Sequence, residues 1–209
     1  MRRIGLTQRV DVIKDYNECR GSLDQRWHEL LLMMDILPVP LPNIDSCYVQ
    51  DLVDDSNLDG VILTGGNSLA FLNPDSDDAS PIRDKFELAL IAHCIKHNLP
   101  ILGVCRGMQI INYFFAGSLK PISGHVNIRH KLRVNQQRIL FPVEVNSFHA
   151  YSITEDNLGN DLNALALDNE GNVEAFEHAS LRISGMMWHP EREISYRKHD
   201  INFIKRALI

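Results

Sequence analysis

One short segment near the middle of the chain constrains the fold most. Gly103-Val104-Cys105-Arg106-Gly107 lies between an apolar stretch at 101–104, which predicts a strand, and one at 108–115, which predicts a helix. This pattern is typical of a nucleophile elbow, the sharp strand-to-helix turn that lifts a reactive side chain out of a sheet. Taken alone, so short a pattern also fits a buried structural cysteine. Cys105 is therefore a candidate nucleophile that needs support from other residues.

The environment expected for Cys105 favours the thiolate form. At the start of a helix, the thiol would meet the positive end of the helix dipole. Arg106, the next residue, is expected to add a nearby positive charge. Both effects predict a thiol pKa below its ordinary value of about 8.5.

Strand and helix patterns alternate through the first half of the chain. Besides the elbow, strands are predicted at 3–7, 39–41 and 59–64, and helices at 22–35 and 81–97. This alternation favours a parallel sheet covered by helices. From about residue 127 the pattern changes to short strands, predicted at 131–134, 142–145, 173–177 and 183–187, and a last helix is predicted from about residue 199. The polar stretch at 73–80 is predicted to be a surface loop, and without repeats or a linker we expect one domain, 1–209.

Composition narrows the classes of protein. With 209 residues, 44% of them hydrophobic, the chain can bury a sizeable core. The net charge of −6 is modest and no basic stripe stands out, so nucleic acid is not an expected partner. No apolar run approaches the roughly 18 residues of a membrane span or resembles a signal peptide, so a cytoplasmic protein is expected. The cysteines at 19, 47, 94 and 105 form no CxxC pair, and the other three are expected to be ordinary thiols.

A base and its orienting group are both present in Trp188-His189-Pro190-Glu191. Pro190 disfavours a helical conformation at His189, and in an extended segment the side chains of His189 and Glu191 point the same way. A carboxylate beside one imidazole nitrogen leaves the other free to face a thiol. Alone, such a triplet is more often a surface turn; combined with an elbow it indicates a Cys-His-Glu triad.

Two backbone amides are candidates for an oxyanion hole. The amide of Arg106 directly follows the nucleophile, and Gly65-Gly66 follows the predicted strand at 59–64. Without a side chain, Gly66 can bring its N–H close to an acyl carbon. An ordinary turn explains Gly65-Gly66 equally well when they are taken alone.

Together these segments resemble the class I glutamine amidotransferase-like hydrolases. The resemblance rests on Ile4-Gly5, LTGG at 63–66, GVCRGMQ at 103–109, VNSFHA at 145–150 and WHPE at 188–191, in the family's order. It implies a three-layer αβα, flavodoxin-like sandwich with a mostly parallel central sheet, and a triad of Cys105, His189 and Glu191. It also implies substrate binding by Gly65 and Gln109, and by the segment that contains Asn146, Ser147 and Phe148; His149 could serve the site or the structure.

The implied reaction is hydrolysis of a γ-glutamyl amide through a thioester. No cofactor is implied, and no His/Asp/Glu group has ligand spacing for a metal. CRGxQ is similar to the branch that hydrolyses γ-glutamyl conjugates such as γ-glutamyl-γ-aminobutyrate, which favours a free-standing enzyme for a small-molecule substrate. A glutaminase subunit that feeds a separate synthetase and a homodimer are left open, whereas a non-catalytic binding module is disfavoured because nucleophile, base and orienting group are all present.

The leaving group is suggested by three further segments. TQR at 7–9, RGSLDQRW at 20–27 and LPVPLPN at 37–43 resemble a sub-branch associated with capsule-polysaccharide phosphoramidate genes, whose hydrolases act on γ-glutamyl-CDP-amidate. A nucleotide diphosphate needs cationic contacts. The candidates are Arg9, Arg20, Arg106, Arg129, His130 and Lys131. Arg9 is favoured because it follows the first strand, and parallel sheets place their sites at the carboxyl ends of strands.

Overall fold

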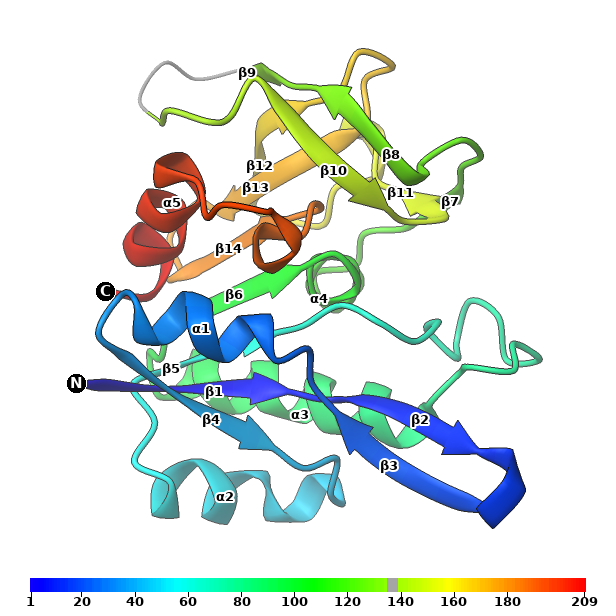
Figure 1. Ribbon diagram of the computed structural model, residues 1–209, viewed down its shortest axis with the longest axis vertical. Coiled ribbons are helices and arrows are strands. Elements are labelled where there is room, and N and C mark those ends of the chain that lie inside the picture. Colours follow the sequence, from blue (N-terminus) through cyan, green and yellow to red (C-terminus); the bar gives the residue numbers. More distant parts are fainter. Residues whose placement is uncertain (135–138) are drawn as a thin grey trace.

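The computed structural model describes residues 1–134 and 139–209, and an eight-stranded sheet forms its centre (Figure 1). Its order is β4-β1-β5-β6-β14-β13-β12-β9. The first five strands are parallel, with bounds β4 (Ile36–Leu41), β1 (Arg2–Thr7), β5 (Gly60–Leu63), β6 (Ile101–Val104) and β14 (Ile183–Met186). The remaining three continue the sheet in antiparallel fashion, as β13 (Val173–His178), β12 (Leu162–Leu167) and β9 (Arg133–Val134).

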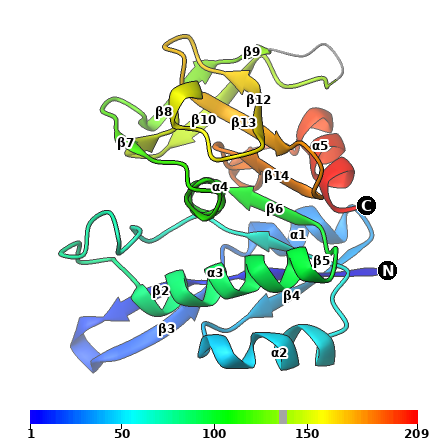
Figure 2. The same cartoon turned by 180° about the vertical axis from the view of Figure 1, so that it is seen from behind.

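Helices cover both faces of this sheet, as the two opposite views show (Figures 1 and 2). On one face lie α1 (Arg26–Leu32) and α5 (Lys198–Leu208), whose buried Trp27 and Phe203 pack in one apolar cluster with Ile4 and Val104 of the strands. On the other lie α2 (Val49–Asp55), α3 (Pro81–Lys96) and α4 (Arg106–Phe114), packed in a second cluster. The predicted three-layer α/β architecture with a mostly parallel sheet is confirmed.

Three two-stranded sheets lie outside the central one. They pair β2 (Arg9–Ile13) with β3 (Glu18–Ser22), β8 (Val126–Lys131) with β10 (Glu144–Phe148), and β7 (Lys120–Pro121) with β11 (Tyr151–Ser152). Single 3₁₀ turns lie at η1 (Lys14–Tyr16), η2 (Ser46–Tyr48), η3 (Glu155–Asn157) and η4 (Pro190–Arg192). The two-stranded β8–β10 sheet stands over the antiparallel end of the central sheet (Figure 1).

Several predicted bounds were wrong. The helix expected at 22–35 begins only at Arg26, because Ser22 still pairs with Arg9 in the β2–β3 hairpin. The strand expected at 131–134 is divided at Leu132 between β8 and β9, and the one expected at 142–145 begins at Glu144. The sequence patterns did not predict α2, β12 or the β2–β3 hairpin, whose strands are largely exposed and lack a clear apolar period.

No helix in the described parts of the chain combines the length and apolar character needed to cross a bilayer.

The carboxyl ends of the parallel strands gather the candidate residues. Thr7 ends β1, Leu63 ends β5 and Val104 ends β6, and Arg9, Gly65 and Cys105 follow within two residues. In parallel α/β sheets this edge is where sites form.

Candidate active site

Cys105 stands on a strained turn between β6 and α4. Its backbone angles are φ 53° and ψ −108°, a conformation that non-glycine residues rarely adopt. Its amide donates to the carbonyl of Met186 at 2.8 Å, which ties the turn to β14. A Cβ added at Gly107 would stand 1.9 Å from the carbonyl oxygen of Leu63. Only glycine allows α4 to approach β5 this closely, which explains the second glycine of the GxCxG pattern.

His189 and Glu191 are joined directly. Nδ1 of His189 lies 2.6 Å from Oε1 of Glu191, and both side chains are buried. His189 is extended, with φ −106° and ψ 95°, as Pro190 predicts, but Glu191 reaches the ring through the 3₁₀ turn η4 rather than along an extended strand. Asn146 holds the backbone of His189 on both sides: its Oδ1 accepts from the His189 amide at 2.9 Å and its Nδ2 donates to the His189 carbonyl at 2.8 Å.

The two reactive side chains favour opposite charges. Burial alone would raise the pKa of Cys105, but the positive charge of His189 and a hydrogen bond with it, helped by His149 and Arg192, hold that pKa below its ordinary value. Burial opposes the charge on His189, but the carboxylate of Glu191 and the thiolate of Cys105 raise the pKa of His189 to about 9. A thiolate facing an imidazolium is the ionisation state that nucleophilic attack by cysteine requires.

The side chain of Arg106 does not serve as expected. It is almost fully buried and pairs with the carboxylates of Asp84 and Glu87 on α3. The expectation that its charge acts on the thiol, or contacts a phosphate, is wrong because two carboxylates already bind that guanidinium. Its backbone amide lies in the first turn of α4, where N–H groups have no acceptor within the helix.

Arg83 shapes the loop after β5. Its guanidinium donates to the carbonyl oxygens of Thr64 at 2.7 Å, Gly65 at 3.2 Å and Gly66 at 2.6 Å, and its Nε binds Glu87 at 2.9 Å. Since Glu87 also binds Arg106, one buried carboxylate connects the loop at 64–66 with the residue after Cys105. The two candidate oxyanion-hole segments are therefore held by the same charge network, which the sequence patterns did not predict.

Gln109, one turn after Cys105, is held through the nitrogen of its side-chain amide. Its Nε2 donates to the carbonyl of Tyr151 at 3.1 Å, which leaves its own amide oxygen available to a ligand. The same carbonyl lies 2.9 Å from Nδ1 of His149, a buried residue just beyond β10.

The segment at 146–148 contributes mostly structure through its side chains. Asn146 is occupied by His189 and by Glu193, and Ser147 donates to the carbonyl of His125 at 2.6 Å. Phe148 packs edge-on against the His189 ring, with centroids 5.8 Å apart. Contact with a substrate through the Asn146 or Ser147 side chain has no support here, which leaves the backbone of this segment and the Phe148 ring.

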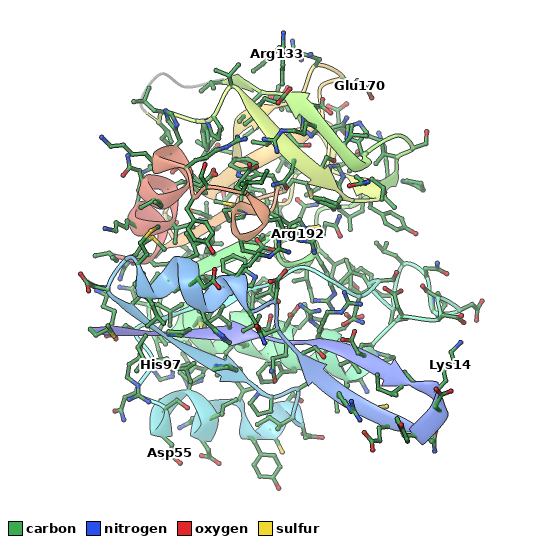
Figure 3. The ribbon with its side chains drawn as sticks, viewed as in Figure 1. Lys14, Asp55, His97, Arg133, Glu170 and Arg192 are labelled. Carbon is green, nitrogen blue, oxygen red and sulfur yellow. The ribbon has the colours of Figure 1, made fainter. Side chains whose placement is uncertain are left out.

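Two cavities meet at Arg192. The first, ≈ 270 Å³, is lined by Arg9, Asp11, Ser22, Leu23, Asp24, Trp27, Thr64, Gly65, Gly66, His189, Glu191 and Arg192. The second, ≈ 650 Å³, includes Arg129, Asn146, Phe148 and Arg192 in its walls. The Arg192 guanidinium lies 4.6 Å from the Phe148 ring centroid, and Arg192 is labelled near the middle of the view in Figure 3. Arg192 was not predicted from the sequence, although its position directly after His189-Pro190-Glu191 was a usable signal.

The other predicted cations have different surroundings. Arg9 lies beside Gly66, where an added Cβ would stand 3.4 Å from its Nη1, although its Nε pairs with Asp11 at 2.7 Å. Arg20 pairs with Glu18 on the exposed hairpin, away from both cavities. Arg129 pairs with Glu144 and Glu193 at the second cavity, and Lys131 is exposed at the end of β8. His130 belongs with His125, His149 and Glu174 to one of two groups in the described residues that could hold a metal ion; the other is His125, Asp168 and Glu170.

Comparison with known proteins places this arrangement in a family. The model of the peptidase C26 family matches residues 4–191. The chain belongs to the peptidase C26 family. It is thus a hydrolase of the class I glutamine amidotransferase-like type, as the motifs predicted.

Individual relatives cover most of the chain. It is 36% identical over 194 residues to the gamma-glutamyl-CDP-amidate hydrolase of Campylobacter jejuni, spanning 91% of this chain and 90% of that protein. It is 29% identical over 188 residues to a glutamine-hydrolysing GMP synthase subunit of Methanococcus aeolicus, spanning 88% and 90%. A glutamine amidotransferase structure from Thermotoga maritima superposes with a TM-score of 0.67 at 16% identity, covering 98% of this chain and 82% of that one, which shows the shared fold.

Proposed function

We propose that this protein hydrolyses the γ-glutamyl amide bond of a small conjugate, with Cys105 as nucleophile, His189 as acid and base, and Glu191 as the group that orients His189. The observation that carries the proposal is the His189–Glu191 contact of 2.6 Å beside a thiol whose pKa is lowered by that same imidazole. Base, orienting group and nucleophile then act as a triad.

The chemistry proceeds in two halves. The Cys105 thiolate attacks the γ-carbonyl carbon, and the resulting oxyanion accepts hydrogen bonds from the amides of Arg106 and Gly66. His189, protonated in the resting state, donates its proton to the departing nitrogen, and a γ-glutamyl thioester remains. His189, now neutral, takes a proton from the water whose oxygen attacks the thioester carbonyl, and collapse of that intermediate releases glutamate and restores the Cys105 thiolate beside the His189 imidazolium.

The surroundings supply contacts for the glutamyl group. Gln109 uses its Nε2 to bind the Tyr151 carbonyl, which leaves its amide oxygen free, and Phe148 packs against the His189 ring; we assign the Gln109 oxygen and the backbone at 146–148 to the α-amino and α-carboxylate groups. Gly65 carries no side chain and leaves room for the imidazole, as an added Cβ there would stand 2.5 Å from Cε1 of His189.

For the leaving group we propose a nucleotide diphosphate, as in γ-glutamyl-CDP-amidate. Two arginines, Arg9 and Arg192, line the cavity that also contains Gly66 and His189. Arginine is the residue best suited to bind phosphate groups. The 36% identity to a hydrolase of γ-glutamyl-CDP-amidate supports the same choice.

A side-by-side assay of γ-glutamyl-CDP-amidate, γ-glutamyl-γ-aminobutyrate and glutamine tests this assignment. We expect kcat/KM for the nucleotide substrate to be at least about a hundredfold higher, and Arg9→Ala to raise KM for that substrate alone. Arg20→Ala is the matched control, since Arg20 lies on the same hairpin but pairs with Glu18 outside both cavities. Equal turnover of γ-glutamyl-γ-aminobutyrate would refute the nucleotide assignment.

One alternative has a specific observation in its favour. The similarity to a glutamine-hydrolysing GMP synthase subunit favours, as the second candidate function, a glutaminase that passes ammonia to a separate synthetase. Such a protein would hydrolyse glutamine slowly by itself and faster with its partner. High turnover of a γ-glutamyl conjugate by the isolated chain would exclude it.

A further inference from the structure

A group of four side chains that could hold a metal ion lies beside the active site, and its only link to the proposed reaction is the positive charge of His149, which helps to lower the pKa of Cys105. His125 precedes β8, His130 lies on β8, His149 follows β10, and Glu174 lies on β13. One potential ligand atom from each lies within 4.8 Å of the others. Nε2 of His149 is 3.5 Å and Nε2 of His130 is 3.6 Å from Oε1 of Glu174.

The cluster is rich in buried polar atoms without a partner. Nδ1 of His125, both ring nitrogens of His130, Nε2 of His149 and both oxygens of Glu174 are buried without a hydrogen bond. Elsewhere in residues 1–134 and 139–209, such histidine nitrogens occur singly, at His28 and His93. A buried polar atom without a hydrogen bond is destabilising, so six of them in one place require a common explanation.

We propose that His125, His130, His149 and Glu174 bind a zinc ion. Three imidazoles and one carboxylate match the ligands of four-coordinate zinc, whereas calcium and magnesium prefer oxygen. Bonds of about 2.0–2.1 Å to zinc require ligand atoms roughly 3.3–3.4 Å apart, close to the two separations of 3.5 and 3.6 Å. The widest separations must contract by up to about 1.5 Å when the ion binds.

The surroundings of the ligands fit a metal site. Nδ1 of His149 lies 2.9 Å from the carbonyl of Tyr151, and a metal-bound histidine ordinarily donates its other nitrogen to such an acceptor. Nε2 of His125 lies 3.8 Å from the buried carboxylate of Asp168 and 3.7 Å from the exposed carboxylate of Glu170, whereas Nδ1 is buried without a hydrogen bond and is the nitrogen that we assign to the zinc.

The ion cross-links two parts of the fold, the two-stranded β8–β10 sheet and the central sheet. Three ligands belong to the two-stranded β8–β10 sheet and the residues that flank it, and the fourth belongs to β13 of the central sheet. The zinc site is also connected to the active site. The Tyr151 carbonyl that lies beside Nδ1 of His149 accepts a hydrogen bond from Gln109, which lies one turn after Cys105. Zinc binding therefore fixes the two-stranded β8–β10 sheet, which contains Phe148, and the position of Gln109.

Zinc content of the full chain tests the inference, in the Cys105→Ala background so that the thiolate cannot bind the ion. After incubation with zinc and dialysis, we expect one zinc per chain by plasma mass spectrometry and an increase of several °C in Tm. Glu174→Gln, which keeps the shape of the side chain, and His130→Ala are each expected to weaken zinc binding at least about tenfold and to abolish the Tm shift. His97→Ala, at an exposed histidine, should behave like the parent.

Two results would overturn the proposal. One is a Cys105→Ala chain that retains no zinc after dialysis and shows no Tm shift. The other is undiminished zinc binding in Glu174→Gln, which would place the ion elsewhere; because this change is nearly isosteric, it decides the matter even if His130→Ala does not fold. Neither result depends on activity, so the proposed hydrolysis stands or fails separately.

Discussion

The ring of His189 lies against the backbone of Gly65. A Cβ added at Gly65 would stand 2.5 Å from Cε1 and 3.3 Å from Nε2 of the imidazole. Even the smallest side chain at this position must displace the ring that faces the Cys105 thiol. The absence of a side chain at Gly65 in the LTGG segment therefore leaves space for the imidazole of the triad, in addition to any hydrogen bond that the segment donates.

Gly65→Ala is expected to lower kcat by at least about tenfold, because a displacement of about 1 Å in a catalytic group can cost as much as a hundredfold. Steady-state kinetics with unchanged circular dichroism measures this. In the control Gly21→Ala, the new Cβ meets only the movable end of the Gln8 side chain at 2.8 Å, so kcat should be retained. Full activity of Gly65→Ala would show that the imidazole need not occupy the observed position.

Glu191→Gln should lose far less activity than His189→Ala. The glutamine amide oxygen can still accept the hydrogen bond from Nδ1, now 2.6 Å long, whereas no other group replaces the base. We expect a loss of about ten- to a hundredfold in kcat for Glu191→Gln and at least about a thousandfold for His189→Ala. Equal losses in two well-folded variants would contradict this division of roles.

The ionisation of the Cys105–His189 pair predicts the pH dependence. Because the pKa of Cys105 is lowered and that of His189 is raised to about 9, thiolate and imidazolium coexist at neutral pH. As pH rises through about 9, His189 loses its proton and the leaving nitrogen loses its acid, so kcat/KM should fall. The raised pKa of His189 likewise stabilises the folded state fully below its unfolded value of about 6.5, and that contribution is lost as pH approaches 9.

Alkylation by iodoacetamide measures the thiolate directly. At pH 7 Cys105 should react well ahead of Cys47, whose pKa is raised by its hydrogen bond to Asp45. In His189→Ala, burial is no longer opposed by the imidazolium, and the Cys105 rate should fall by at least about tenfold, since each pKa unit changes the thiolate fraction tenfold. An unchanged rate in His189→Ala would mean that His189 does not set the thiol pKa.

Glu87→Gln should destabilise the protein without touching a substrate. Glu87 is fully buried between Arg83 and Arg106, and removing one partner of a buried ion pair costs about 3–5 kcal/mol. Urea denaturation measures the change. Glu18→Gln, which breaks the exposed pair with Arg20, is the matched control and should cost under about 1 kcal/mol. Similar losses in the free energy of unfolding for the two variants would show that the buried network does not stabilise the fold.

Residues that act locally were predictable from the sequence. Cys105 and His189 stand in short motifs, and in each motif one neighbour has a local steric role. Gly107 has no Cβ that would collide with the Leu63 carbonyl, and Pro190 keeps His189 extended. The parallel strands were predictable because they are continuously apolar.

Residues that act through distant partners were not predictable. Arg106 follows the nucleophile, yet its side chain turns to Asp84 and Glu87, some twenty residues away. The four residues of the His-Glu cluster come from separate segments, so no spacing along the chain could reveal them. Long-range pairing of side chains depends on packing that local patterns do not encode.

The central claim is that Cys105 attacks a γ-glutamyl carbonyl, and the most direct measurement is mass spectrometry of the protein after reaction with a glutamine-derived electrophile. We predict one label per chain, on the peptide that contains Cys105, together with loss of glutamate release in a folded Cys105→Ala variant. A label on Cys19, Cys47 or Cys94, with Cys105→Ala still active, would contradict it.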